Sequence, residues 1–248
     1  MLHFIRIESL FCLLVGMIHG GILSAQDAGS SSVRPGINKA FLDPDLDVQR
    51  WLDTFEVESR EIFQSRRSIA DAMKLGRGDH VADVGSGTGL FLELISRRVG
   101  SDGHVYAVDI APAFVTRARE VAETRDLRNI TPVLGGQANV RLAPKSIDVA
   151  FLCDVYHHFE YPTASLQSLH RALRSGGSLI VIDFNRIEGI TRQWLLDHVR
   201  ADKQTFKQEI EAAGFQFVGE ESIDGLSENY FLRFLKLDDT DEPTQAES

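Results

Sequence analysis

The first candidate ligand-binding residues lie in a glycine-rich turn. Residues 81–89 read Val-Ala-Asp-Val-Gly-Ser-Gly-Thr-Gly, and an amphipathic run follows at once. Glycines let a backbone bend sharply and approach a ligand closely, and a helix that begins after them offers unpaired N–H groups. The residues of this predicted nucleotide-binding turn are Asp83, Gly85, Ser86, Gly87 and Gly89.

The glycine spacing argues against a nicotinamide-dependent oxidoreductase. A dinucleotide fingerprint that starts at Gly85 needs a third glycine at position 90, where this chain has leucine. A second carboxylate, Asp109, ends the next predicted strand, residues 104–109. One carboxylate can accept from two neighbouring hydroxyl groups, which suits a ribose.

Turn, helix, strand and terminal aspartate in this order resemble the first motifs of class I S-adenosylmethionine (SAM)-dependent methyltransferases. The resemblance covers residues 48–236 and is greatest to small-molecule and quinone-type methyltransferases. It implies SAM as cofactor, with Asp83 and the glycines at its methionine part, Asp109 at the ribose and Ile110 beside the adenine. It also implies a Rossmann-like α/β fold, a doubly wound seven-stranded sheet that is mostly parallel with one antiparallel strand near the C-terminus.

The loop after the third predicted strand departs from the family pattern. Many relatives have an acidic residue near the adenine amino group, but this chain has Gly136 at that place. Gln137 or Asn139 could supply a side-chain oxygen instead, or a backbone carbonyl could accept. Gly136 and Gln137 are therefore predicted cofactor contacts.

A polar and aromatic run follows the fourth predicted strand, residues 147–153. By resemblance it touches the methyl-donor end of SAM and the acceptor, with Asp154 on the cofactor side. Tyr156, His157 and His158 are the candidate catalytic residues on the acceptor side, and a histidine could act as general base. On an extended chain only one of the two histidines would face the pocket. No metal site is expected, because no further Cys/His cluster accompanies them.

The elements that must position these residues alternate between strands and helices. The predicted strands span residues 80–84, 104–109, 130–134, 147–153, 178–184, 215–221 and 229–236. The predicted helices span residues 89–99, 112–125, 162–174 and 203–213, after one or two helices between 48 and 73. Residues 185–203 form either a lid over the acceptor or a simple packed helix. Continuous apolar strands are expected when helices cover both faces of a sheet.

The two ends of the chain differ from its centre. Residues 1–25 have Arg6 before an apolar run of nine residues, shorter than the roughly 20 that span a membrane, and predict a signal peptide for export to the periplasm or outside. An uncleaved membrane anchor is the alternative. Residues 26–45 are expected to be a flexible linker, 46–237 the methyltransferase domain and 238–248 an acidic disordered tail.

Charge and cysteine content narrow the function. The net charge of −10 disfavours nucleic-acid binding, which depends on clustered Lys and Arg. The chain has only two cysteines and lacks the set expected of arsenic methyltransferases. The sequence thus predicts methyl transfer from SAM to a small-molecule acceptor by direct displacement. The alternative is an exported, non-catalytic module that keeps this fold, and no feature of the sequence specifies an oligomeric state.

Overall fold

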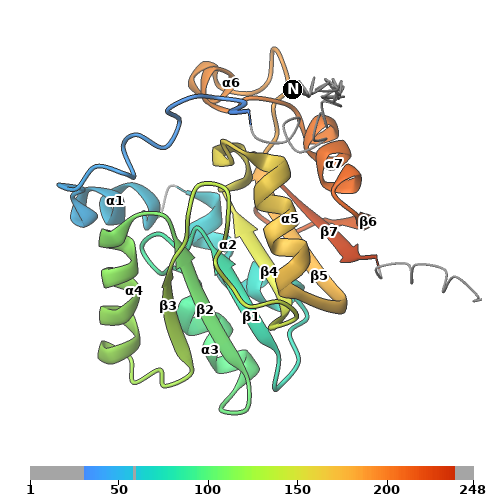
Figure 1. The fold of residues 1–248 in the computed structure, drawn as a ribbon. Helices are drawn as coiled ribbons and strands as arrows, with labels where there is room; N and C mark the ends of the chain where they lie inside the picture. The colour runs from blue at the N-terminus through green and yellow to red at the C-terminus, as the bar shows by residue number, and fades with distance from the viewer. Residues whose placement is uncertain (1–30, 58–59, 238–248) are drawn as a thin grey trace, which may run out of the picture.

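A seven-stranded sheet forms the centre of the protein (Figure 1). The computed structural model describes residues 31–57 and 60–237, so the predicted signal peptide and acidic tail lie outside the described residues. The strand order is β3-β2-β1-β4-β5-β7-β6. β7 pairs antiparallel with both β5 and β6, whereas the other pairs are parallel. The predicted fold class is confirmed.

The strands are β1 His80–Val84, β2 His104–Asp109, β3 Ile130–Leu134, β4 Ile147–Cys153, β5 Leu173–Phe184, β6 Phe215–Glu221 and β7 Asn229–Lys236. The helices are α1 Val48–Phe55, α2 Glu61–Ala72, α3 Leu92–Val99, α4 Pro112–Thr124, α5 Pro162–Ala172, α6 Gln193–His198 and α7 Lys203–Ala212, with a 3-10 turn, η1, at Tyr156–His158. No helix among residues 31–57 and 60–237 has the length and apolar character needed to cross a bilayer.

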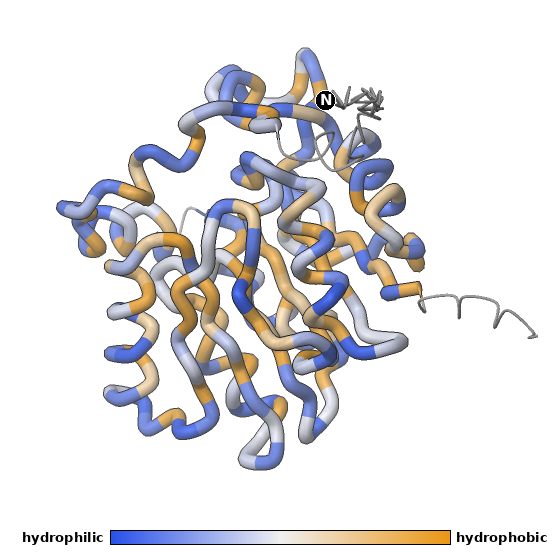
Figure 2. The backbone as a smooth tube through the Cα atoms, in the orientation of Figure 1, coloured by the Kyte–Doolittle hydropathy of each residue, from blue (hydrophilic) through white to orange (hydrophobic). Residues whose placement is uncertain are grey.

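Alternating side chains of the central strands build two cores. Phe151 in β4 packs with α2, α3 and α4, while its neighbour Leu152 packs with α5 and α7. Successive side chains of a strand point to opposite faces, so a fully apolar strand needs a helix layer on each side. Figure 2 shows the matching pattern on α4, which is hydrophobic toward the sheet and hydrophilic on its outer side. Burial on both faces thus explains why these strands read as unbroken apolar runs.

β5 begins five residues earlier than the sequence predicts. Leu173 already pairs with Ile147, and the register then shifts before Ser178 pairs with Val149. Gly176, which lies between the predicted helix and the predicted strand, is inside this irregular strand at φ +70°. Glycine has no Cβ and accepts this left-handed conformation, so the strand can bulge without ending.

The segment of residues 31–47 does not behave as the predicted linker. The Val33 N–H donates to the Glu160 carbonyl at 2.9 Å, and Phe41 stacks against Trp51 with ring centroids 4.8 Å apart. In Figure 1 this segment, drawn in blue, passes from α1 to the neighbourhood of α6. These contacts contradict a flexible linker for residues 31–45, because they fix this segment against the rest of the fold; residues 26–30 of the predicted linker lie outside the described residues.

Glu61, the first residue of α2, joins this helix to the loop before β7. Its two carboxylate oxygens accept from the backbone N–H groups of Ser227, Glu228 and Asn229 at 2.7–2.9 Å. Asn229 in turn donates to Asp154 at the end of β4. A single carboxylate therefore ties an N-terminal helix to the C-terminal hairpin and to the edge of the sheet that holds the site.

We expect Glu61→Ala to lower the free energy of unfolding by about 2 kcal/mol, because three backbone donors lose a charged acceptor. Urea denaturation followed by circular dichroism measures the change. Arg128→Ala, which removes an exposed ion pair with Asp126, is the control and should stay within about 0.5 kcal/mol of the unchanged protein. Equal values for the two variants would contradict the anchoring role of Glu61.

Candidate active site

A cavity lies at the carboxyl ends of the strands, next to the point where the strand order reverses between β1 and β4. Open α/β sheets bind ligands at this point, because the connections on either side diverge there and leave a crevice. The cavity is lined by the ends of β1, β2 and β3, the turn after β4, the N-terminal segment and α5. Its polar lining residues include Asn38, Asp109, Gln137, Asn139, His158 and Ser165.

The glycine turn after β1 has the geometry of a close-approach loop. Gly85 lies at φ +73°, and a Cβ placed on it would be 2.4 Å from a methyl carbon of Val155. Gly87 also has a positive φ, +52°. Only glycine accepts this combination of conformation and contact without strain. The turn predicted from Gly85, Gly87 and Gly89 is present, although the helix after it begins at Leu92 rather than at 89.

Asp109 faces the cavity and is held by backbone donors. Gly87 N–H donates to its Oδ2 and Ala111 N–H to its Oδ1, both at 2.9 Å. Burial raises the pKa of Asp109 to about 6, while these backbone hydrogen bonds act in the opposite direction. A carboxylate has about four acceptor positions, so two remain for hydroxyl groups. This geometry fits the predicted ribose contact, with Ile110 beside it in the cavity wall.

Asp83 is a buried carboxylate with an unpartnered oxygen. Its Oδ2 has no hydrogen-bond partner among the described residues. Burial, and then the charge of Asp109, raises its pKa to about 7. Ser86, in the glycine turn, also has a buried hydroxyl without a partner. Buried polar atoms are rarely left alone, so these two are suited to the charged amino-acid end of a ligand such as SAM.

The part of the cavity that is predicted to bind adenine is lined by the predicted residues, none of which has a carboxyl group. Gly136 and Gln137 both line the cavity. A Cβ at Gly136 would lie 3.5 Å from the guanidinium of Arg141, an ordinary contact distance. The Gln137 amide oxygen lies 3.5 Å from the Asn38 amide nitrogen, which the N-terminal segment supplies. Amide groups therefore stand where relatives have a carboxylate.

Asp154 does not line the cavity. It forms an ion pair with Arg60, and its Oδ1 accepts from Asn229 Nδ2 at 2.5 Å. Burial raises its pKa to about 6, and Arg60 opposes this shift. Both of its carboxylate oxygens thus have protein partners, and its contact with the cofactor stays a prediction. Asp154 instead links β4 to α2 and β7, directly behind the turn that holds Val155 against Gly85.

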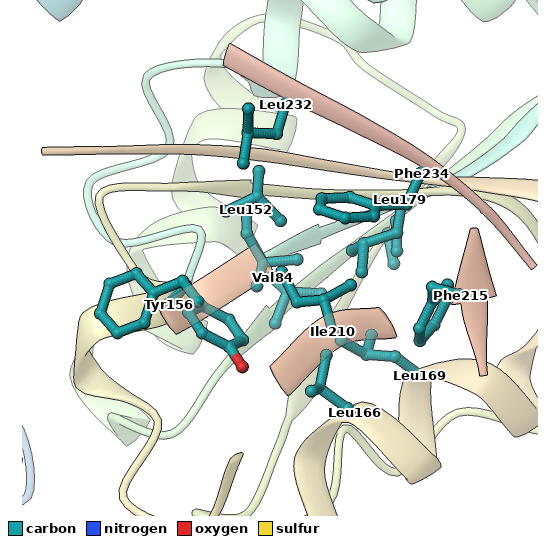
Figure 3. Close-up of a cluster of buried hydrophobic side chains, with 14 of the residues drawn as sticks. Val84, Leu152, Tyr156, Leu166, Leu169, Leu179, Ile210, Phe215, Leu232 and Phe234 are labelled. Atoms are coloured by element: carbon teal, nitrogen blue, oxygen red, sulfur yellow. The ribbon is translucent and has the colours of Figure 1, made fainter. Parts of the chain in front are cut away.

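Tyr156 is not at the site, and its prediction as a catalytic residue is wrong. It is fully buried in the same apolar cluster as Val84, Leu152 and Ile210 (Figure 3). Its hydroxyl donates to Glu209 at 2.8 Å, and burial together with that carboxylate raises its pKa. The prediction depended on an extended chain at residues 156–158. These residues form the 3-10 turn η1 instead, which directs the Tyr156 ring into the core.

The same turn brings the rings of both histidines together, and only one of them faces the cavity, as predicted. The rings of His157 and His158 have centroids 4.3 Å apart. His158 lines the cavity, whereas His157 lies behind it with Nδ1 2.7 Å from Asp183 Oδ1. Burial and the neighbouring His157, His198 and Arg34 lower the pKa of His158 to about 2. Its imidazole is therefore uncharged at neutral pH.

A third histidine, His198 at the end of α6, completes the group. Its ring centroid lies 5.0 Å from those of His157 and His158. Sequence reasoning excluded a cluster because His198 is 40 residues from His158. It also missed Asp183, although a lone acid within the apolar run of β5 marked a buried charge like Asp109. No local pattern indicated that Asn38 would reach the cavity.

Comparisons with known proteins identify the family of this chain. The profile of a family described as "Methyltransferase domain" matches residues 75–237. The chain belongs to the methyltransferase-domain family. The predicted membership of the SAM-dependent methyltransferases is thereby confirmed, with SAM as the cofactor that this membership assigns.

Several relatives indicate the range of this family. An arsenite methyltransferase of Halobacterium salinarum is 32% identical over 129 residues, 47% of this chain and 33% of that protein. The ubiquinone/menaquinone biosynthesis C-methyltransferase UbiE of Idiomarina loihiensis is 24% identical over 64% of this chain and 75% of its own. A SAM-dependent methyltransferase structure from Aquifex aeolicus has a TM-score of 0.68 at 22% identity and covers 77% of this chain and 99% of its own. The chain thus spans a third of the first relative and most of the other two.

The buried carboxyl of Asp83 makes a pH-dependent stability prediction. Folding raises its pKa above the unfolded value, so the folded state holds the proton more tightly, and stability falls as the pH rises from about 4 through 7. We expect Asp83→Asn to raise the thermal midpoint by several degrees at pH 8, with a much smaller gain at pH 5. Differential scanning calorimetry at both pH values measures this. Asp126→Asn, an exposed control, should change neither midpoint.

The placement of Tyr156 makes a second prediction. Tyr156→Phe should cost about 1–2 kcal/mol of stability, because Glu209 loses one donor while it keeps Arg200. Affinity for S-adenosylhomocysteine should stay within about twofold, because the ring lies in the core. Chemical denaturation and calorimetric titration measure the two quantities. A large loss of affinity with unchanged stability would restore Tyr156 to the site.

Proposed function

We propose that this protein transfers the methyl group of SAM to a small, largely apolar acceptor. The observation that carries the proposal is the pairing of two sites at one sheet edge. Gly85 and Asp109, which offer groups for the donor, line the same cavity as His158, and Asp83 lies in β1 just before the glycine turn. An acceptor held at the histidines would therefore lie beside the donor's binding groups.

The donor supplies an activated sulfonium methyl group, so the protein needs mainly to align two molecules and exclude water. Asp109, fixed by Gly87 and Ala111, is positioned to accept from hydroxyl groups. Asp83 offers an unpartnered carboxylate oxygen to an ammonium group. The carboxylate of Asp183 accepts from His157 Nδ1 and orients that ring beside His158, which lines the cavity.

The surroundings of the histidines favour an acceptor with an aromatic or apolar body. The ring of Phe184 lies 5.7 Å from His157 and 6.3 Å from Trp194. Trp194 and Ile190 of the segment around α6 are 52% and 79% exposed, which gives an apolar approach to the cluster. The relative named for ubiquinone and menaquinone biosynthesis points in the same direction. A phenol or hydroquinone that aims its hydroxyl at the histidines satisfies both the apolar wall and the polar end.

Arsenite is not the proposed acceptor, although one relative is named for it. Cys153 is the free cysteine among the described residues. Burial raises the pKa of its thiol well above the usual value, and a protonated thiol is a poor ligand. The thiolate set that soft arsenic(III) requires is therefore missing from the described part of the chain.

Calorimetric titration with S-adenosylhomocysteine tests the donor site. We expect micromolar binding by the unchanged protein and a loss of about 10–100-fold in Asp109→Asn, because a charged acceptor is replaced by a neutral amide. The matched control is Asp148→Asn, which changes a strand carboxylate that accepts from His80 N–H at the opposite end of the sheet. Equal affinity in all three proteins would place the donor elsewhere.

Acceptor turnover separates the enzyme from the alternative, an exported module without activity. The full chain with SAM and a panel of phenols, hydroquinones and amines should form S-adenosylhomocysteine, detected by mass spectrometry, with at least one acceptor. Binding of S-adenosylhomocysteine without methylation of any acceptor in the panel would favour the non-catalytic module. If the folded, unchanged protein does not bind S-adenosylhomocysteine, both the enzyme and the non-catalytic SAM-binding module are refuted.

A further inference from the structure

Three imidazoles from two distant parts of the chain form a compact group beside the donor cavity. His157 and His158 come from η1, and His198 comes from the C-terminal end of α6. One ring nitrogen of each residue lies within 4.8 Å of those of the other two. His157 is 2% exposed, and the other two are half-buried. Three ligand atoms this close, in a partly closed site, are the usual protein contribution to a catalytic metal centre.

One nitrogen pair already has the spacing of a metal site. His158 Nε2 lies 3.3 Å from His198 Nε2. Two nitrogens bound to one tetrahedral ion at about 2.0–2.1 Å lie roughly 3.3 Å apart. A ring nitrogen of His157 lies within 4.8 Å of both and has to move closer to complete the triangle. His158 Nδ1 is buried without a partner, so no hydrogen bond prevents this ring from turning toward an ion.

Asp183 supports the cluster in the way that carboxylates support metal-bound histidines. It is fully buried, and its Oδ1 lies 2.7 Å from His157 Nδ1. The backbone N–H groups of His157 and Phe184 also donate to it, at 3.0 and 2.8 Å. This arrangement fixes the tautomer of His157 and leaves its Nε2 free. Such carboxylate–histidine pairs orient metal ligands and raise their basicity.

The charges around the cluster are compatible with a cation. Asp183 contributes a buried carboxylate on one side. Arg34 approaches from the other, and its guanidinium donates to the carbonyls of Asp197 and His198. It therefore anchors the end of α6, which places His198. The guanidinium of Arg34 is directed at these carbonyls, and the carboxylate of Asp183 remains available to balance the charge of a bound ion.

We propose that His157, His158 and His198 bind a divalent transition-metal ion of the Zn²⁺ class, with Asp183 as a positioning residue. Imidazole ligands suit Zn²⁺, Co²⁺ and Fe²⁺, and three protein ligands leave one coordination position open. Because His158 also lines the donor cavity, the ion lies next to the expected position of the methyl group.

The open position gives the ion a chemical role, which rests on the proposed function. A coordinated acceptor hydroxyl loses its proton to water near neutral pH, because the ion stabilises the oxygen anion. That oxygen then forms a bond to the methyl carbon, and the carbon–sulfur bond breaks with its electron pair left on sulfur. The proposed acceptor class is therefore a phenol or other hydroxyl compound small enough to reach the ion.

Titration of the untagged full chain with Co²⁺, followed by displacement with Zn²⁺, tests the site. We expect one Co²⁺ per chain with the intense visible bands of four-coordinate cobalt, and loss of these bands when Zn²⁺ is added. His198→Ala should weaken Zn²⁺ binding at least about 30-fold, and Asp183→Asn should weaken it about 10–100-fold. If His198→Ala unfolds, His198→Gln retains the bulk of the side chain and serves in its place.

The matched control is His104→Ala. His104 and His80 form a second histidine pair, with ring centroids 6.1 Å apart, at the amino ends of β2 and β1. Unchanged affinity in His104→Ala together with loss in His198→Ala supports the proposed site. Loss in His104→Ala alone, or no binding by the unchanged protein, overturns it. Binding of S-adenosylhomocysteine is measured in the same samples, so failure of the metal site and failure of the donor site are distinguished.

Discussion

Buried carboxylates at the carboxyl ends of parallel strands are the constraint around which this structure is built. β1, β2 and β5 each contain a buried aspartate near their carboxyl ends, Asp83, Asp109 and Asp183. A fourth aspartate, the half-buried Asp154, follows β4. Removing a carboxylate from water is costly unless another group compensates. Four of them at one edge of a sheet therefore dictate what the neighbouring segments must supply.

Each carboxylate is compensated in a different way, and the differences define the site. Asp109 accepts from the backbone of the glycine turn, and Asp154 is paired with Arg60 and Asn229. Asp183 accepts from His157 and two backbone groups. Asp83 retains an oxygen without a partner. Asp154 and Asp183 are therefore compensated within the protein, whereas Asp83 and Asp109 keep acceptor positions that a ligand can use.

The segments that complete the site come from both ends of the described chain. Asn38 donates to the His158 carbonyl at 3.1 Å, and the ring of Phe41 packs edge-on against His158. Arg34 holds the end of α6 from the same segment. The N-terminal segment therefore covers the donor cavity and positions the histidine cluster together. This coupling explains how a cavity typical of a widely shared fold can acquire an acceptor side of its own, since function resides in the site rather than in the fold.

The sheet, its order of elements, the glycine turn and the acid at the end of β2 could all be predicted from the sequence. Apolar strands, glycine turns and terminal acids are local patterns, and their effect on the backbone does not depend on distant residues. The turn at Gly85 and the position of Asp109 could be predicted for this reason. The surroundings of the histidines depend on tertiary packing and could not be predicted. The 3-10 turn sent Tyr156 into the core, and the packing of α6 brought His198 to two histidines 40 residues away. Contacts between segments far apart in the chain leave no periodic or spacing signal, because they depend on how whole elements pack rather than on neighbouring residues.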